Sequence, residues 1–392
     1  MSDKSHDELN DELNDEPAKP DFDREQFLAW RNPRTGIANP ERMTNPVWKW
    51  FHQNKLNAYQ ANQYFDGPDS MSAGPVWTTD RFGQTSTKLS DGRNVLIGGE
   101  HEDFYDPDFY IYNDVIVEST DGELEIYGYD REKFPPTDFH TATRVGDQII
   151  LIGNTGYPES RAFGTTQVLT LDLKTLKISQ ETAGGDCPGW ISRHSAKLSE
   201  DRQSIIVTGG HLFLDEDSPM LENFDSWRLD IQSWNWERLT DVKWQQWHLA
   251  RDDGEPNNLW NIRSSLDRQG MGLSDETILE QFPPEARELM AEALSVDESI
   301  DPTQLDQLYS PPIDHKTIER ELLDEEDDNC DQYNSYRIEI NGVVIRFTEN
   351  MYQVEMVVEG ELPDQIVSQV MEDTCNKLEQ IEKAKFVAQR FD

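Results

Sequence analysis

Acidic and aromatic side chains gather in three loops that each follow a short apolar run. The loops read "EHEDFYDPDFYIY" over residues 100–112, "NTGYPESRAF" over 154–163 and "GHLFLDEDSPML" over 210–221. Two connections, residues 128–139 and 183–190, are expected at the same edge of the fold. Aromatic anchors among carboxylates are typical of a surface that binds a basic protein. The sequence therefore predicts a partner-binding site made of His101, Glu102, Asp103, Tyr105, Asp106, Asp108, Tyr110, Tyr157, Arg161, His211, Asp215 and Glu216.

Metal or catalytic chemistry has weaker support in the sequence. Asp103, Asp106 and Asp108 alternate along one loop, and alternating carboxylates can converge on Ca²⁺, but their spacing matches no known calcium loop. A phosphate loop, a serine elbow and a zinc spacing are not found. The sequence therefore predicts no catalytic residue, no metal, no cofactor and a protein that is not an enzyme.

Two histidines, His140 and His194, recur at equivalent positions. A catalytic role would require a nucleophile or a metal beside them. An upstream segment of the same kind has Gln84 near that position. A structural role as hydrogen-bonding groups is therefore expected for both histidines.

The elements that must position the loops are repeated along the chain. Gly98, Gly153 and Gly209 end the apolar runs "NVLIGG", "QIILIGN" and "SIIVTGG", and they stand 55 and 56 residues apart. A short polar strand and a turn precede each run, and a third and a fourth strand follow each loop. Because glycine lets another backbone approach closely, these strands are expected to end against a neighbouring element.

Two further features mark the repeat. One is the diglycine of the first and third copies, and the other is an acid at the end of the third strand, Glu118, Asp172 or Asp230. With the aromatic residue in "DIQSWNWERL", these features resemble the kelch repeat family over about residues 77–243, although the second copy has Asn154 in place of the second glycine. The resemblance implies one propeller blade per repeat. It also implies structural roles for Gly98, Gly99, Gly153, Gly209, Gly210, Asp172, Asp230 and Trp236.

Three blades do not close a ring, because propellers have four or more. Other elements must therefore cover the exposed edges. The aromatic, helix-capable residues 45–65 are one candidate, and the C-terminal strands are another. The predicted fold is mainly β: a partial kelch-like β-propeller of three four-stranded blades, with a helical connector and a small C-terminal β-β-β-α domain.

Composition divides the chain into five parts. Residues 1–25 are acidic and nearly free of apolar residues, which predicts a disordered tail. A helical and aromatic segment is expected over 26–76, the blades over 77–243, a helical connector with an acidic linker over 244–330, and an α/β domain over 331–392.

Local signals support the last two parts. A capping signature begins at Ser274, and a helix is expected over 283–294. Asn341-Gly342 predicts a two-residue hairpin between alternating strands. A helical apolar stripe that should lie on the sheet consists of Ile366, Val370, Thr374, Leu378 and Ile381.

The charge balance is strongly acidic, with 35 Lys and Arg against 77 Asp and Glu and a net charge of −42. Such a field repels nucleic acid and anionic membranes and attracts cationic partners, although solubility or a saline habitat would also explain it. Cys187, Cys330 and Cys375 are too far apart for a disulfide framework or a zinc spacing, so reduced thiols are expected. No signal peptide or membrane-spanning run is visible, which predicts a soluble cytoplasmic protein.

Together these features predict a bacterial, non-catalytic binding protein with a basic protein partner. One concrete form is an immunity protein that covers the active site of a cationic toxin. Two alternatives stay open. Kelch-like blades also build copper oxidases similar to galactose oxidase, but that chemistry needs a tyrosine crosslinked to a cysteine, and no matching ligand set accompanies Cys187. The other alternative is a structural protein that self-associates and closes the ring between two chains.

Overall fold

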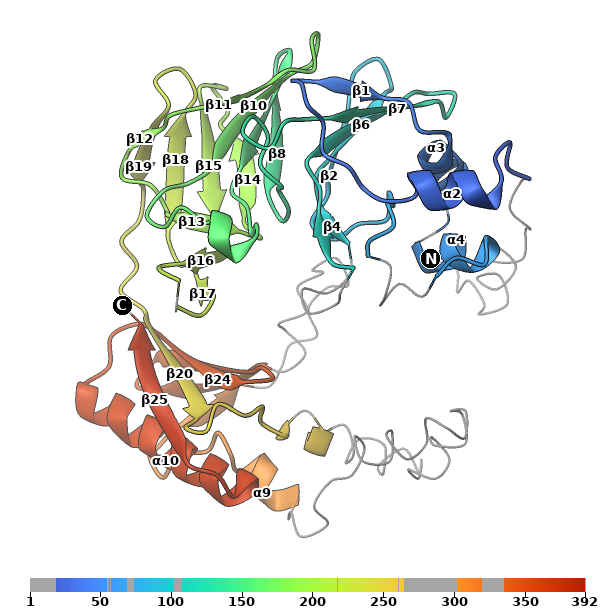
Figure 1. Ribbon diagram of the computed structural model, residues 1–392. Coiled ribbons are helices and arrows are strands. Elements are labelled where there is room, and N and C mark those ends of the chain that lie inside the picture. The colour runs from blue at the N-terminus through green and yellow to red at the C-terminus, as the bar shows by residue number, and fades with distance from the viewer. Residues whose placement is uncertain are drawn as a thin grey trace, which may run out of the picture. The chain divides into compact units, whose positions relative to one another are not determined.

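The computed structural model divides the chain into two compact units, residues 1–241 and 242–392 (Figure 1). It describes residues 19–54, 56, 58–68, 74–101, 108–216, 218–259, 261–263, 302–318 and 335–391. Most of the regular structure in these residues is antiparallel β-sheet, which confirms the predicted mainly β class.

Three antiparallel meanders of four strands follow one another in the first unit. Sheet 1 contains β2 (Thr85–Lys88), β3 (Asn94–Ile97), β6 (Asp114–Glu118) and β7 (Leu124–Gly128). Sheet 2 contains β8 (Thr141–Val145), β9 (Gln148–Ile152), β10 (Val168–Asp172) and β11 (Ile178–Gln180). Sheet 3 contains β14 (Ser195–Leu198), β15 (Ser204–Thr208), β18 (Ser226–Asp230) and β19 (Asn235–Arg238). Each predicted repeat is a four-stranded sheet, and no sheet in the described residues closes on itself.

Two short strands extend these sheets at their edges. β1 (Glu41–Met43) pairs with β7, and β12 (Gly184–Gly185) pairs with β19 in parallel. The N-terminal segment therefore contributes an edge strand to sheet 1.

The glycines that end the second strands allow one sheet to pack against the next. Gly98 and Gly153 have positive φ angles of 59° and 78°. A Cβ atom on Gly98 would overlap the carbonyl oxygen of Thr137, and one on Gly153 would overlap that of Ile191. Gly209, their equivalent in sheet 3, has open space around it. The expected close approach is therefore confirmed at the two sheets that have a successor in the described residues of this unit.

Apolar side chains fill the spaces on both sides of sheet 2. The cluster between sheets 1 and 2 includes Val95, Ile97, Val115, Ile149, Leu151 and Leu171. The cluster between sheets 2 and 3 includes Ile150, Ile152, Val168, Val207, Trp227 and Trp236. Because sheet 2 is covered on both faces, its inner strand β9 is continuously apolar from Ile149 to Ile152.

Two equivalent hydrogen bonds also join the sheets. His140 Nε2 lies 2.9 Å from Thr85 Oγ1, and His194 Nε2 lies 3.0 Å from Thr141 Oγ1. Burial lowers the pKa of His140 to about 3 and that of His194 to about 4. The expected hydrogen-bonding role is confirmed, and each bond links neighbouring sheets.

Three short helices cover the outer face of sheet 1: α2 (Arg24–Trp30), α3 (Pro46–Gln53) and α4 (Ala58–Tyr64). Trp48 of α3 stacks on Trp77 with ring centroids 5.1 Å apart, and both belong to a cluster that contains Ile116 and Ile126 of sheet 1. The prediction that residues 45–65 cover an exposed edge is therefore wrong in part: α3 covers a face of sheet 1, and the edge strand β7 pairs with β1.

The boundary of the predicted acidic tail needs correction. Asp23 caps α2 through a hydrogen bond from the backbone of Gln26, and Phe22 packs against Trp50 and Phe65. Ordered structure therefore begins before residue 25, because these side chains reach the N-terminal aromatic cluster. Residues 1–18 lie outside the described residues.

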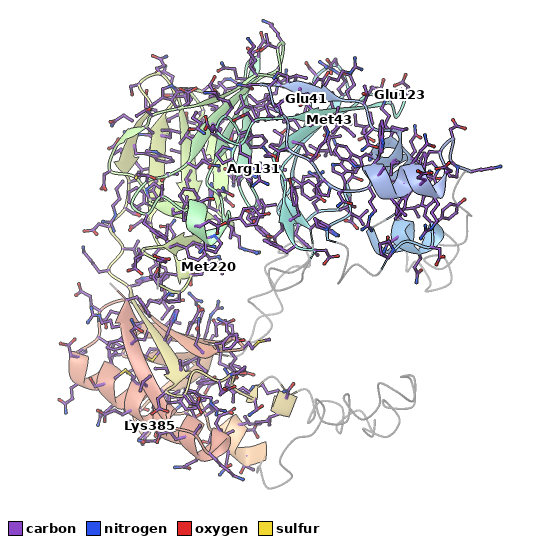
Figure 2. All side chains as sticks on the ribbon, in the orientation of Figure 1. Glu41, Met43, Glu123, Arg131, Met220 and Lys385 are labelled. Atoms are coloured by element: carbon purple, nitrogen blue, oxygen red, sulfur yellow. The ribbon has the colours of Figure 1, made fainter. Side chains whose placement is uncertain are left out.

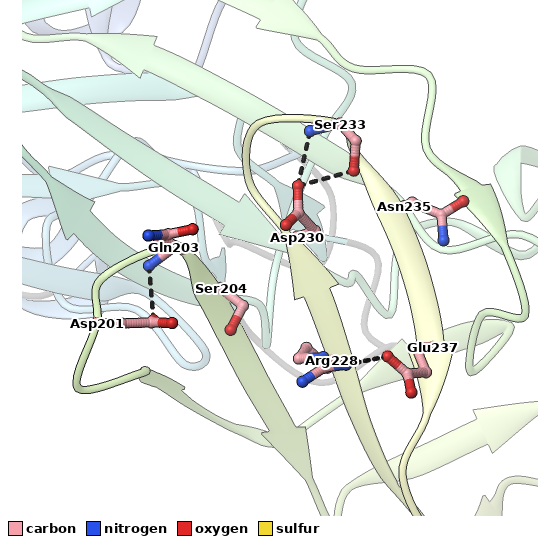
Figure 3. Close-up of a pocket in the computed structure, with 8 residues that line it drawn as sticks. All are labelled: Asp201, Gln203, Ser204, Arg228, Asp230, Ser233, Asn235 and Glu237. Atoms are coloured by element: carbon pink, nitrogen blue, oxygen red, sulfur yellow. Dashed lines mark hydrogen bonds and ion pairs between the residues drawn. The ribbon is translucent and has the colours of Figure 1, made fainter.

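The outer face of sheet 3 is polar. On this face, Ile206 pairs with Arg228. At the equivalent positions of sheet 2, Ile150 pairs with Thr170, and Ile150 belongs to the buried cluster between sheets 2 and 3. Figure 3 shows the open depression on this face, in which Arg228 forms an ion pair with Glu237. The stack of sheets thus ends on a solvated surface, as terminal repeats do in open arrays.

The second unit is one six-stranded antiparallel sheet with a long helix against it. Its order is β21 (Lys316–Ile318), β22 (Ser335–Ile340), β23 (Val343–Glu349), β24 (Gln353–Glu359), β20 (Gln245–Arg251) and β25 (Phe386–Phe391). α10 (Asp364–Glu382) packs on it, and a short α9 (Pro302–Asp306) adds Leu305 to the same core.

The predictions for this unit are confirmed in part. Asn341 and Gly342 have φ angles of 52° and 81° in the turn between β22 and β23, as the hairpin signal predicts. The predicted stripe of α10 is buried except for a half-buried Ile366, and Val367 is buried beside it.

The predictions of a helical connector over 244–330 and of a three-stranded C-terminal sheet are wrong in one respect. Residues 245–251, placed in the connector, form β20 between β24 and β25, so the sheet has six strands. Pairing with strands about a hundred residues away decides this, and the polar sequence "QQWHLAR" carries no clear local signal. Ser274 and the helix over 283–294 lie outside the described residues.

Candidate functional site

The predicted loops meet at one end of the three sheets, where β4 (Glu100–His101), β5 (Tyr110–Ile111), β13 (Trp190–Ser192), β16 (His211–Phe213) and β17 (Leu221–Glu222) lie (Figure 1). We call this surface, with residues 154–163 and Phe82, the loop face. The short helix η1 (Pro158–Ser160) lies within residues 154–163.

Direct contacts tie the three loops together. The Ile111 N–H donates to the Tyr157 hydroxyl at 2.9 Å, which joins the first loop to the second. The Arg161 guanidinium lies 3.8 Å from the ring centroid of Phe213, which joins the second loop to the third. Arg161 also donates to the Thr155 carbonyl at 3.0 Å. Two of the predicted residues, Tyr157 and Arg161, therefore organise the loop face.

The remaining predicted residues fall into three groups. Tyr110 and His211 are half-buried, and Asp215 and Glu216 are exposed, so these four are available at the surface. His101 and Asp108 are only 6% and 5% exposed, so they support the face from within. The predicted residues that lie outside the described residues are Glu102, Asp103, Tyr105 and Asp106.

Apolar side chains on the loop face are a feature that the sequence prediction missed. Phe82 is 65% exposed, Leu214 46% and Met220 37%. Phe82 and Glu100 exchange backbone hydrogen bonds of 3.0 and 2.8 Å, which places Phe82 beside β4. Leu214 and Met220 flank the turn between β16 and β17, and Figure 2 marks Met220 there. Exposed apolar anchors beside carboxylates are what a protein interface requires.

A buried carboxyl group beneath the loop face was also missed. Asp138 is 0% exposed and accepts a hydrogen bond of 2.7 Å from the Gly156 N–H, while its own N–H donates to Asn154 Oδ1 at 2.9 Å. Burial raises the pKa of Asp138, against the opposing effects of the Gly156 N–H and of nearby Glu100 and Arg193. A single acid in a loop offers no sequence signal of this role, which is to hold residues 154–156 in place.

The residues expected to be structural have identifiable roles. Asp172 Oδ1 accepts from the N–H groups of Lys174 and Thr175, and Asp230 Oδ1 accepts in the same way from Gln232 and Ser233. These bonds close the turns between the third and fourth strands of sheets 2 and 3. Trp236 is 2% exposed in the core between those sheets. Gly99 and Gly210 have positive φ angles of 91° and 84°.

The described residues contain no group of three His, Cys, Asp or Glu side chains placed to hold a metal ion. Cys187 and Cys375 are free thiols, and burial raises the pKa of Cys375 to about 11. Cys330 lies outside the described residues. Among the helices described, none has the length and apolar character needed to cross a membrane.

No protein-family model matches this chain, and no curated protein matches it significantly. Function must therefore be inferred from the loop face itself, because a fold does not fix a function.

Proposed function

We propose that the loop face is a binding surface for a basic protein. The observation that carries this proposal is that the loop face has the exposed apolar side chains Phe82, Leu214 and Met220 as well as the exposed Asp215 and Glu216. An immunity protein that neutralises a cationic toxin is one concrete form of this function.

Preorganisation favours the loop face as an interface. The loops are held by Tyr157, by Arg161 and, from beneath, by Asp138. A surface that is already ordered loses less conformational entropy when a partner binds. The net charge of −42 would speed the encounter with a cationic partner and make it sensitive to salt.

We also infer that the three sheets are blades of an open, kelch-like propeller. Their face-to-face packing, the glycines at the ends of the second strands and the equivalent histidine bonds support this inference. The polar outer face of sheet 3 disfavours the alternative in which two chains close a ring, because Arg228 and Glu237 would have to be buried there.

The test compares two triple variants with similar changes in apolar surface and no change in charge. Partners are captured from native lysate at low salt, released at high salt and identified by mass spectrometry. The affinity of the captured basic protein is then measured with Phe82, Leu214 and Met220 changed to Ser. Loss of three apolar anchors should weaken binding about 100-fold.

The control changes Ile37, Leu239 and Met351 to Ser, since these exposed side chains lie outside the loop face. The control should bind like the parent. Equal binding by the parent and the loop-face variant would contradict the proposal, as would the absence of any salt-sensitive basic partner.

A further inference from the structure

A pocket of the first unit, lined by residues other than those of the loop face, combines groups suited to nucleophilic catalysis. An open pocket of about 540 Å³ lies between α3 and the end of β6, and His52, Gln53, Leu56, Thr79, Asp80, Glu118 and Gly122 line it. His52 Nδ1 lies 3.4 Å from Thr79 Oγ1, and His52 Nε2 lies 3.3 Å from Glu118 Oε1. The imidazole thus bridges a hydroxyl group and a carboxylate inside the pocket.

We propose that Thr79, His52 and Glu118 form a hydrolytic site for small acyl esters. A nucleophile within reach of a base, with a third group that orients the base, is the arrangement expected for acyl transfer, and such distances are often long before a substrate binds. Glu118 accepts from Nε2–H, so Nδ1 is the nitrogen that is free to take the Thr79 proton.

Three well-packed elements hold these side chains in place. His52 lies at the end of α3, whose Trp48 and Phe51 are both 1% exposed. Thr79 follows Thr78, whose N–H donates to the Tyr112 hydroxyl at 3.3 Å. Glu118 ends β6 and pairs with Asn94 of β3. Groups on rigid elements keep the geometry that catalysis requires.

A departure from the repeat directs Glu118 to this site. The equivalent acids, Asp172 and Asp230, use their carboxylates to close their own turns. In the first repeat the corresponding turn is closed by Ser119, whose hydroxyl donates to the Glu123 carbonyl at 3.0 Å. The Glu118 carboxylate is therefore released from the structural role and contacts His52.

The proposed reaction has two steps. In the first, Thr79 Oγ bonds to the acyl carbon as its proton passes to His52 Nδ1, and the alcohol leaves with that proton. In the second, water attacks the Thr79 ester, and its proton passes through His52 to Thr79 Oγ, which releases the carboxylic acid. Asp80 and Glu118 disfavour an anionic substrate, so the substrate is a neutral or cationic ester.

The experiment measures hydrolysis of p-nitrophenyl acetate by the full chain and labelling by a fluorophosphonate probe. We expect Thr79→Val and His52→Gln to lower kcat/KM at least about 100-fold, and Thr79→Ser to retain activity. The label should map to Thr79 in the mass spectrum. Thr165→Val, an exposed threonine outside the pocket, is the matched control and should behave like the parent.

Glu118 acts through His52, so it is a positioning residue. Glu118→Gln should lower kcat with little change in KM and alter the pH profile of kcat/KM. A purely structural role would change only the melting temperature. Hydrolysis that Thr79→Val leaves unchanged, no hydrolysis by the parent, or a label on another residue would overturn the proposal. Binding of a basic protein at the loop face should persist in Thr79→Val, so failure of one proposal is distinguishable from failure of the other.

Discussion

The two ends of the stack of sheets differ in how they meet solvent. At the N-terminal end, α2, α3 and α4 bury the outer face of sheet 1 under an aromatic cluster. At the other end, the outer face of sheet 3 pairs Thr208 with Ser226 where sheet 2 pairs the buried Ile152 with Val168. Arg228 and Glu237 are exposed on the same face. An open array needs protection at both ends, and this chain uses helices at one end and polar substitution at the other.

The comparison predicts that removing a side chain destabilises the protein more at the N-terminal end of the stack than at the other end. Trp48→Ala should lower the free energy of unfolding by about 3 to 5 kcal/mol, because it removes a buried ring that stacks on Trp77. Arg228→Ala should change it by no more than about 0.5 kcal/mol, since the ion pair with Glu237 is exposed. Urea unfolding of both variants measures the difference. Similar losses would show that the two ends are protected in the same way.

The two contacts between neighbouring sheets that His140 and His194 form should make stability depend on pH. The pKa values of about 3 for His140 and about 4 for His194 lie below the ordinary value of 6.5, so the unfolded chain binds more protons in that range. Stability should therefore fall as pH drops below about 6.5, by about 2 to 3 kcal/mol per histidine at pH 4.

His101 and His248 contribute with the same sign, and Asp138, whose pKa is raised, contributes with the opposite sign. The readout is therefore the difference between the parent and a variant with both His140 and His194 changed to Gln. Unfolding by urea at pH 7 and pH 4.5 should show a smaller pH effect in the variant. If the parent and the variant showed the same pH effect, the pH dependence would not come from His140 and His194.

Gly153 and Gly209 compare a strand end that packs against the next sheet with one that has open space around it. Gly153→Ala and Gly209→Ala both place alanine at a positive φ, at a cost of about 1 kcal/mol each. Only the Gly153 variant also forces Ile191 to move, which should cost about 1 to 2 kcal/mol more. Thermal unfolding followed by circular dichroism measures both. Equal melting temperatures would indicate that sheet 3 has a neighbour after all.

Local signals predicted the regular elements well. The glycine pairs located the second strands, Asn341-Gly342 located a hairpin, and the stripe from Val370 to Ile381 located the buried face of α10. Each signal works within a few residues, because turn geometry and side-chain periodicity are properties of the local backbone. Two of the eight predicted loop-face residues that the structure describes, Tyr157 and Arg161, rest on the same kind of signal, since they lie in the loop that follows β9.

The composition and order of residues determined the repeat, its strands, the charge and the hairpin, since these depend on neighbours in the chain. Tertiary structure alone decided that β20 joins a sheet about a hundred residues downstream. It also placed Asp138 beneath the loop face and brought Thr79, His52 and Glu118 together from segments 27 and 66 residues apart. Such contacts depend on how elements that are far apart in the sequence pack against each other, and no local pattern encodes them.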